Sequence, residues 1–215
     1  TPFNLCDSPW IAARDADGHL QELSILQAFA QADNWQALAG ELPTQDVAVL
    51  RLLEAIMLRA VAAERTESEA ARTWNSWWKA KKLPLSEISG YLERYHDRFD
   101  LVDSSRPFMQ VADLRSPSGK ASGLTKLIAE VPDGWRFFTL RDGTGVERLS
   151  LAEAARWLVH CQAFDTSGIK TGAVGDPRVK QGKGYAIGTG LTGGLGVVYP
   201  EGTNLLETLL LNLCL

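Results

Sequence analysis

The chain has 215 residues, a formal net charge of −4 at pH 7, and hydrophobic residues at 45% of its positions. This length and composition suit a globular protein with a sizeable core, and no apolar run approaches the ~18 residues that cross a bilayer. The start of the chain lacks the features of a secretory signal. The three dispersed cysteines, Cys6, Cys161 and Cys214, argue against a disulfide framework and fit a reducing cytoplasm.

The first elements are predicted to be a β-hairpin and a short helix. Two short extended runs, Trp10–Arg14 and His19–Leu23, flank an Asp/Gly turn at Asp15–Gly18. Ser24 and Gln27 then match a capping box, in which each side chain bonds the backbone of the other. We therefore expect a helix from this point to about residue 32.

The clearest helical pattern begins at Pro43, with Thr44 as its predicted N-cap, and continues to about residue 63. Apolar residues recur there at steps of three and four, which places them on one helical face: Leu50, Leu53, Met57, Ala60 and Val61. Further apolar residues widen this face. A helix so apolar is expected at the centre of the core.

A second helix is predicted over Thr66–Lys81, with Trp74, Trp77 and Trp78 on one side and lysines at its end. Aromatic rings beside lysines would suit a platform for stacking bases. Tryptophans at helical spacing more often pack in a core, and we favour that interpretation. Ser86 is predicted to cap the next helix, whose apolar face carries Ile88, Tyr91, Leu92 and Tyr95.

The middle of the chain is predicted to be largely irregular. Four apolar residues in the segment Arg98–Gln110 are expected to anchor it to the core: Phe99, Leu101, Phe108 and Met109. A polar loop over 113–122 follows, then a short helix over 124–130 and a β-rich run over 135–140.

Two helices are predicted near the C-terminal end. Ser150 and Glu153 form a capping box for the first. Its inward residues are expected to be Leu151, Ala154, Ala155, Leu158 and Cys161. Thr203 is predicted to cap the second, whose apolar sequence reaches Leu215 without a capping signal; this predicts an apolar surface that a missing partner covers.

The stretch Gly168–Gly196 stands out because ten of its residues are glycine. It carries four basic residues, Lys170, Arg178, Lys180 and Lys183, against the single acid Asp176. Glycine lets the backbone approach a ligand closely, and bare N–H groups can bind anions. A basic, glycine-rich island in an acidic chain suits a phosphate-bearing partner such as nucleic acid, although a mobile surface loop explains the composition equally well.

Catalytic and metal-binding patterns are absent from the sequence. There is no CxxC or HExxH motif. His160 and Cys161 are adjacent, but neighbours on a helix point about 100° apart and do not face each other. We therefore predict a protein that is not an enzyme and needs no metal or other cofactor.

Three regions resemble the CasA family, the large subunits of the type I-E CRISPR surveillance complex Cascade. The first is the start, Asn4–Ile11, and the second combines Arg98–Leu101 with Arg106–Gln110, whose PFMQ core is its specific part. The third is the glycine loop over Gly184–Gly194 with the apolar helix Thr203–Leu213. They occur in the family's order along the whole chain.

The resemblance implies an α+β fold, with residues 1–215 as an N-terminal domain and a C-terminal helical bundle absent from this chain. It implies a non-catalytic subunit that recognises the protospacer-adjacent motif of double-stranded DNA. The implied partners are the target DNA, the guide RNA, other Cascade subunits and a helicase-nuclease, with no membrane. Cysteine pairs that hold a metal in some family members are missing here.

The resemblance also implies which residues contact nucleic acid. The family's glycine loop, which reads the minor-groove side of the motif, matches Gly182, Lys183, Gly184, Tyr185 and Ala186, where the family has three consecutive glycines. The basic neighbours Arg178 and Lys180 are expected to contact phosphates. A second loop, over 135–143, carries the matching aromatic Phe138.

Two other interpretations of the glycine stretch remain open. One is a phosphate- or nucleotide-binding enzyme, although the pattern G-x-x-x-x-G-K-[ST] is absent and Gly182-Lys183-Gly184 has no Ser or Thr after its lysine. The other is a purely structural interaction subunit with a glycine loop that binds nothing. A nucleotide-binding screen would separate the enzyme from the nucleic-acid interpretation. DNA binding that does not depend on the loop would favour the structural subunit.

Overall fold

The computed structural model describes residues 2–62, 66–131, 139, 141, 147–165, 169–184, 190, 192–193 and 195–215. The helices are α1 (Ile25–Ala30), α2 (Pro43–Ala60), α3 (Glu67–Ala80), α4 (Leu85–Arg94), α5 (Leu151–Phe164) and α6 (Leu205–Asn212), with short 3-10 turns at His96–Arg98 and Leu124–Lys126. The strands are β1 (Ile11–Arg14), β2 (Leu20–Leu23), β3 (Ala37–Leu38), β4 (Lys170–Thr171) and β5 (Lys183–Gly184). The predicted α+β class is confirmed.

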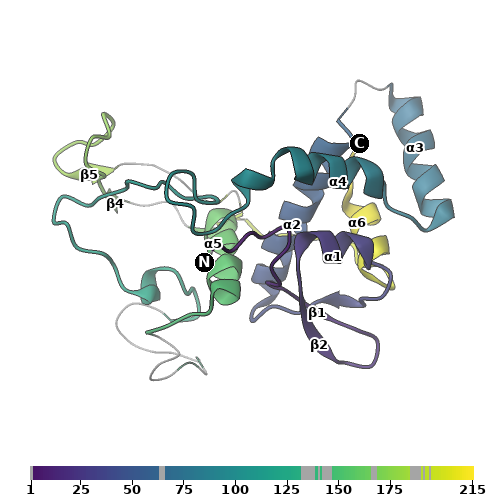
Figure 1. Ribbon diagram of the computed structural model, residues 1–215, viewed down its shortest axis with the longest axis horizontal. Coiled ribbons are helices and arrows are strands. Elements are labelled where there is room, and N and C mark those ends of the chain that lie inside the picture. Colours follow the sequence, from purple (N-terminus) through teal and green to yellow (C-terminus); the bar gives the residue numbers. More distant parts are fainter. Residues whose placement is uncertain are drawn as a thin grey trace.

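The elements are distributed along an elongated molecule (Figure 1). The antiparallel sheet β2-β1-β3 lies with α1, α2, α4 and α6, while β4 and β5 form a separate pair at the opposite end from α3. Helix α5 lies between these two ends. Among the residues with described positions, no helix combines the length and apolarity that a bilayer span requires.

Helix α2 is the centre of the core, as its sequence predicts. Leu53 and Met57 are completely buried, and the helix contacts α4, α5 and α6. Its predicted cap is wrong: Leu42 is the N-cap, and Pro43 takes the first helical position, where its missing N–H costs nothing. Thr44 instead places its Oγ1 atom 3.0 Å from Nε2 of His160 on α5.

Helix α3 lies at the edge of the molecule and has no fully buried residue. The Trp74 and Trp78 rings stack at 5.3 Å, and the indole of Trp74 donates to the Leu210 carbonyl of α6 at 2.7 Å. The Lys81 ammonium lies 3.9 Å from the Trp78 ring and 2.8 Å from the carboxylate of Glu207. The tryptophans are thus half-buried: Trp74 fastens α3 to α6, while Trp77 and Trp78 pack against the core.

Two further predicted caps are one or two residues out of place. Helix α4 begins after Pro84 rather than at Ser86, because proline at the N-cap position presets the backbone there. Helix α6 is capped by Asn204, whose Oδ1 accepts from the Glu207 amide at 2.9 Å, while the Thr203 hydroxyl donates to the Glu207 carboxylate. Asparagine outranks threonine as a cap, which explains the shift.

The capping box of α5 at Ser150 and Glu153 is confirmed, and its predicted buried face is correct only in part: Ala155 is completely buried, and Ala154 and Leu158 are half-buried against the core. Leu151 is 41% exposed, whereas Arg156 and His160 are buried beside the apolar residues Ala152, Trp157 and Val159. Arg156 donates to the carbonyl of Trp10 at 2.7 Å and to the carboxylate of Glu22 at 2.6 Å. Polar residues with distant partners thus occupy a face that hydrophobic spacing alone cannot identify.

The two motifs Asn4–Ile11 and Arg98–Gln110 lie against each other. Leu5 donates its amide to the carbonyl of Phe99 at 2.9 Å, and the carboxylate of Asp100 accepts from the amide of Phe3 at 3.2 Å. Three of the predicted anchors in this segment, Phe99, Leu101 and Phe108, are buried. The motifs therefore pack against each other as part of the fold.

Met109 is the exception among the anchors, because it is 41% exposed with φ 53°. The side-chain amide of Gln110 donates to the carbonyls of Leu101 and Phe108, which turns the chain so that Met109 faces solvent. The predicted helix over 124–130 is limited to the 3-10 turn Leu124–Lys126. Most of the predicted β-rich run over 135–140 lies outside the described residues.

Candidate nucleic-acid interface

Part of the glycine stretch forms a β-hairpin. Strands β4 and β5 pair antiparallel, with Lys170 opposite Gly184 and Thr171 opposite Lys183. At the tip, Lys180 and Lys183 exchange two backbone hydrogen bonds of 3.0 Å. The residues between them, Gln181 and Gly182, have φ values of 51° and 75°, which is the geometry of a type I′ turn.

The basic side chains of this hairpin differ in whether they form ion pairs with acidic residues. The guanidinium of Arg178 makes two hydrogen bonds of 2.9 Å to the carboxylate of Asp176 and thereby lowers the pKa of that carboxyl group. The Lys170 ammonium lies 3.0 Å from the carboxylate of Asp165. Lys180 and Lys183 are exposed and make no ion pair within the part of the chain that the structure describes. Among the described cations of the hairpin, these two lysines are therefore available to a ligand.

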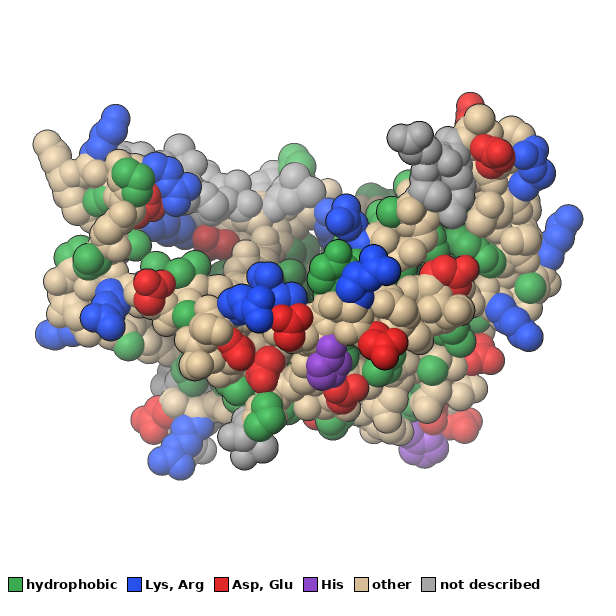
Figure 2. Space-filling model, turned by 45° about the horizontal axis from the view of Figure 1, so that its top comes forward, with side chains coloured by type: hydrophobic (Ala, Val, Ile, Leu, Met, Phe, Trp, Pro, Cys, Tyr) green, Lys and Arg blue, Asp and Glu red, His purple; other side chains and the backbone are tan. Residues whose placement is uncertain are grey.

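A neighbouring loop extends the basic character of this end of the molecule. The amide of Val174 donates to the carbonyl of Arg115 at 3.0 Å, which ties the polar loop over 113–122 to the hairpin. Lys and Arg side chains gather at the left end of Figure 2, where Figure 1 places β4 and β5. No sequence pattern indicates that Arg115 lies near the hairpin, because its proximity depends on a backbone contact between residues 59 positions apart.

Several glycines in the stretch serve packing. A β-carbon on Gly172 would overlap the side chain of Val179, and one on Gly190 or Gly193 would overlap the backbone at the C-terminal end of α5. The amide of Gly190 donates to the carbonyl of Asp165 at 2.7 Å, and that of Thr192 donates to the carbonyl of Ala163 at 3.0 Å. This segment therefore satisfies carbonyls that the end of α5 leaves free.

The predicted contact residues fall into two groups. The structure brings Lys180, Gly182, Lys183 and Gly184 together at the hairpin, with Arg178 on the same segment and Gly184 buried. The remaining predicted contacts lie outside the described residues: Phe138, Tyr185 and Ala186.

Arg141, just beyond Phe138 in the chain, is fixed to the helical core. Its guanidinium Nε donates to the carboxylate of Glu41 at 3.0 Å, and its Nη2 lies 3.2 Å from the carboxylate of Glu153 on α5. The indole of Trp157, also on α5, donates to the same Glu41 at 3.1 Å. One end of the predicted second loop is therefore held by a network of ion pairs.

The adjacent His160 and Cys161 are not arranged as a nucleophile pair. Burial lowers the pKa of His160, whose Nε2 atom already contacts the Thr44 hydroxyl. Burial also raises the pKa of the Cys161 thiol, which disfavours the thiolate needed for attack.

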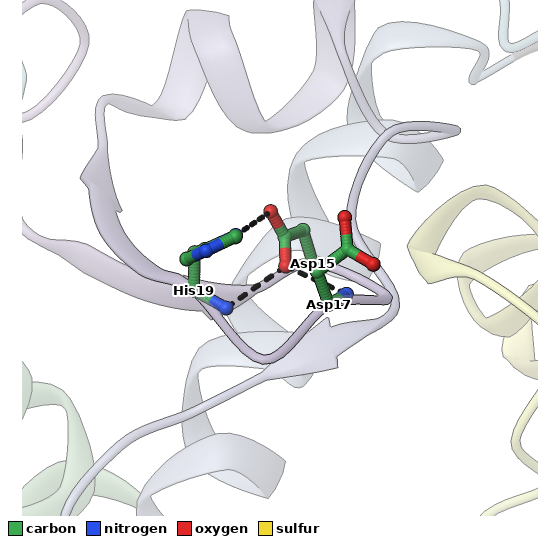
Figure 3. Close-up of side chains that lie close together, drawn as sticks. All are labelled: Asp15, Asp17 and His19. Atoms are coloured by element: carbon green, nitrogen blue, oxygen red, sulfur yellow. Dashed lines mark hydrogen bonds and ion pairs between the residues drawn. The ribbon is translucent and has the colours of Figure 1, made fainter.

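Asp15, Asp17 and His19 lie close together at the tip of the β1–β2 hairpin (Figure 3). One carboxylate oxygen of Asp15 accepts from the amides of Asp17 and His19 at 2.9 Å, and the other lies 3.0 Å from Nδ1 of His19. The hydrogen bond from the His19 amide is the main cause that lowers the pKa of Asp15. These contacts close the turn and account for the cluster without a metal ion.

The nucleotide-enzyme interpretation also finds no support in the hairpin. A phosphate-binding P-loop joins a strand to the start of a helix. Gly182 and Lys183 instead occupy a turn that leads into strand β5, and the next helix of the described chain, α6, begins only at Leu205.

Comparisons with known proteins cover the whole chain. The family described as CRISPR-associated protein Cse1 matches residues 4–214. A curated relative, the CRISPR-associated protein CasA/Cse1 of Thermus thermophilus, is 33% identical over 217 residues, which include 98% of this chain and 39% of the relative.

Solved structures agree with the family match. The crystal structure of Thermobifida fusca Cse1 is 50% identical with a TM-score of 0.87, over 99% of this chain and 39% of that one. A chain of a CRISPR RNA-guided surveillance complex, 24% identical, shares the fold with a TM-score of 0.75, over 99% of this chain and 43% of that one. This chain thus spans about 39% of the length of the curated relative, and it belongs to the Cse1 (CasA) family of CRISPR-associated proteins.

Proposed function

We propose that the chain is the N-terminal domain of a CasA-like large subunit that recognises the protospacer-adjacent motif of double-stranded DNA. In this proposal it acts in an RNA-guided complex beside guide RNA and other Cascade subunits. It performs no chemistry and helps to recruit a helicase-nuclease. A C-terminal helical bundle would complete the subunit.

The observation that carries the proposal is the basic β4–β5 hairpin in a member of this family. Lys180 and Lys183 are exposed cations at its tip, and Gly184 lies in the middle of the predicted groove-reading segment, residues 182–186. A minor groove about 6 Å wide admits glycine backbone where larger side chains collide. Readout of this kind is permissive, and guide pairing then supplies sequence identity.

The two roles, motif reading and phosphate neutralisation, can be separated by experiment. Duplexes with matched and scrambled motifs are titrated with the assembled complex over a range of salt concentrations. We expect Gly184→Val to reduce discrimination between the two duplexes while leaving the salt slope unchanged, because the charge is unaltered. Gly196→Val is the matched control, since Gly196 is exposed and has open space around its α-carbon.

Thermal unfolding of each variant accompanies the titrations, because Gly184 is buried and a side chain there can also disturb packing. Unchanged discrimination in a folded Gly184→Val protein would place motif reading elsewhere. Salt-independent binding by the wild-type complex would contradict phosphate contacts by the hairpin.

A further inference from the structure

The tip of the β4–β5 hairpin brings two lysines into direct opposition. Lys180 and Lys183 exchange both backbone hydrogen bonds, N–H to O in each direction, at 3.0 Å. Residues paired in this way lie about 5.5 Å apart at their α-carbons, and their side chains point to the same face of the ribbon. The two ammonium groups therefore extend from one face of one turn.

Such an arrangement is unfavourable for the isolated chain. Like charges directly opposite each other destabilise an antiparallel pair. The single acid of the glycine stretch, Asp176, is already bound by both arms of Arg178. Within the described part of the chain, neither lysine has an acidic partner that would relieve the repulsion.

We propose that Lys180 and Lys183 form a clamp for a single phosphate group. Each ammonium is a compact point charge on a flexible stem, so two of them from one face can converge on the oxygens of one anion. The assignment of that phosphate to the backbone of target DNA rests on the proposed function above. On sequence alone the same lysines would count as two separate phosphate contacts.

The turn is what holds the clamp together. A type I′ turn requires positive φ at both central residues, which glycine adopts at no steric cost. Gly182 has φ 75° with nothing near its α-carbon, so a side chain there strains the backbone without a clash. Gln181, at φ 51°, occupies the position where asparagine is favoured. Gly182→Val should therefore open the clamp without a change in charge, and Gln181→Asn should preserve it.

The first experiment tests the clamp without DNA. Inorganic phosphate is titrated into the protein, and the side-chain ε-methylene signals of lysine are followed by NMR. We expect the signals of Lys180 and Lys183 to move with one shared midpoint. Lys180→Gln and Gly182→Val should each shift the midpoint at Lys183 to at least threefold higher phosphate, and Gln181→Asn should leave it unchanged.

A second experiment asks whether the phosphate belongs to DNA. The salt slope of duplex binding by the assembled complex counts neutralised phosphates, at roughly one unit each. With a shared phosphate, Lys180→Gln or Lys183→Gln alone should leave the slope nearly unchanged, and the double variant should lower it by about one unit. The matched control is the double variant Lys79→Gln/Lys82→Gln, which removes two exposed lysines at the α3 end of the molecule.

The possible outcomes separate the clamp from the proposed function. Independent midpoints for the two lysines, or no response to phosphate, would overturn the clamp. Slope losses of about one unit for each single variant and two for the double variant would also overturn it. Coupled phosphate binding with an unchanged slope in the double variant would support the clamp and contradict its placement on DNA.

Discussion

Gly190 lies so close to Ala163, in the last turn of α5, that a β-carbon on Gly190 would overlap the Ala163 carbonyl group. Backbone atoms cannot move aside as a flexible side chain can. We therefore expect Gly190→Ala to lower the free energy of unfolding by about 1–3 kcal/mol, the usual cost of overpacking. Gly196→Ala, with open space around its α-carbon, should change it by less than about 0.5 kcal/mol. Equal effects in urea unfolding would contradict the packing role of Gly190.

The second prediction concerns the central helix α2. Leu53 is completely buried, whereas Leu58 on the same helix is 38% exposed. Leu53→Ala should cost about 2–5 kcal/mol of unfolding free energy because it leaves a cavity in the core. Leu58→Ala is the matched control and should cost far less. Chemical denaturation that gives similar midpoints for the two variants would show that α2 is not central.

The third prediction concerns pH. Burial raises the pKa of Glu54 on α2 from 4.5 to about 7, against the opposing effect of Arg51. One carboxylate oxygen of Glu54 is buried without a hydrogen-bond partner among the described residues. Because the folded pKa lies above the unfolded one, the protonated group stabilises the fold below about pH 4.5, and this contribution is lost as pH rises through 7.

Glu54→Gln should remove that dependence. As pH rises from 4.5 to 7.5, the variant should gain about 2 kcal/mol of unfolding free energy relative to the wild type. This figure is the free energy equivalent to the pKa shift, reduced because Glu54 is partly exposed. Glu93→Gln on α4 is the control, since Glu93 is exposed. Stability is measured by urea unfolding at several pH values. If wild type and Glu54→Gln lose stability in parallel as pH rises, the buried carboxylate of Glu54 is not the cause of the pH dependence.

The fourth prediction tests the ion-pair network around Arg141. Its side chain is 11% exposed and bonds the carboxylates of both Glu41 and Glu153. Arg141→Met leaves two partly buried carboxylates near each other and should destabilise the fold by about 1–3 kcal/mol. Adding Glu41→Gln should recover part of that loss, because it removes one of the two charges. A double variant no more stable than Arg141→Met would argue against charge repulsion as the cause.

Local signals in the sequence predicted much of the fold. The capping boxes at Ser24 and Ser150 and the Asp/Gly hairpin turn each depend on residues within a few positions of one another, and the structure contains all three. The caps at Thr44 and Thr203 were wrong because neighbouring Pro43 and Asn204 are better suited to the helix start.

Long-range contacts explain what the sequence could not indicate. Arg156 and His160 are buried through partners at Trp10, just before β1, and on β2 and α2, so their polar character concealed the inner face of α5. The basic glycine stretch was visible in composition. Its division into a hairpin tip and the Gly190–Gly193 segment packed on α5 depends on contacts that composition does not encode.

The pairing of the N-terminal segment with the middle of the chain has a consequence for synthesis. The amide of Phe3 bonds the carboxylate of Asp100, which follows it by 97 residues. At about 5–20 residues per second, the ribosome needs roughly 5–20 s to make the chain between them. During that time Phe99, whose carbonyl accepts from the amide of the buried Leu5, has not yet been synthesised. The segment around Leu5 thus lacks its native partner, and is open to chaperones, until residues near 100 have left the exit tunnel.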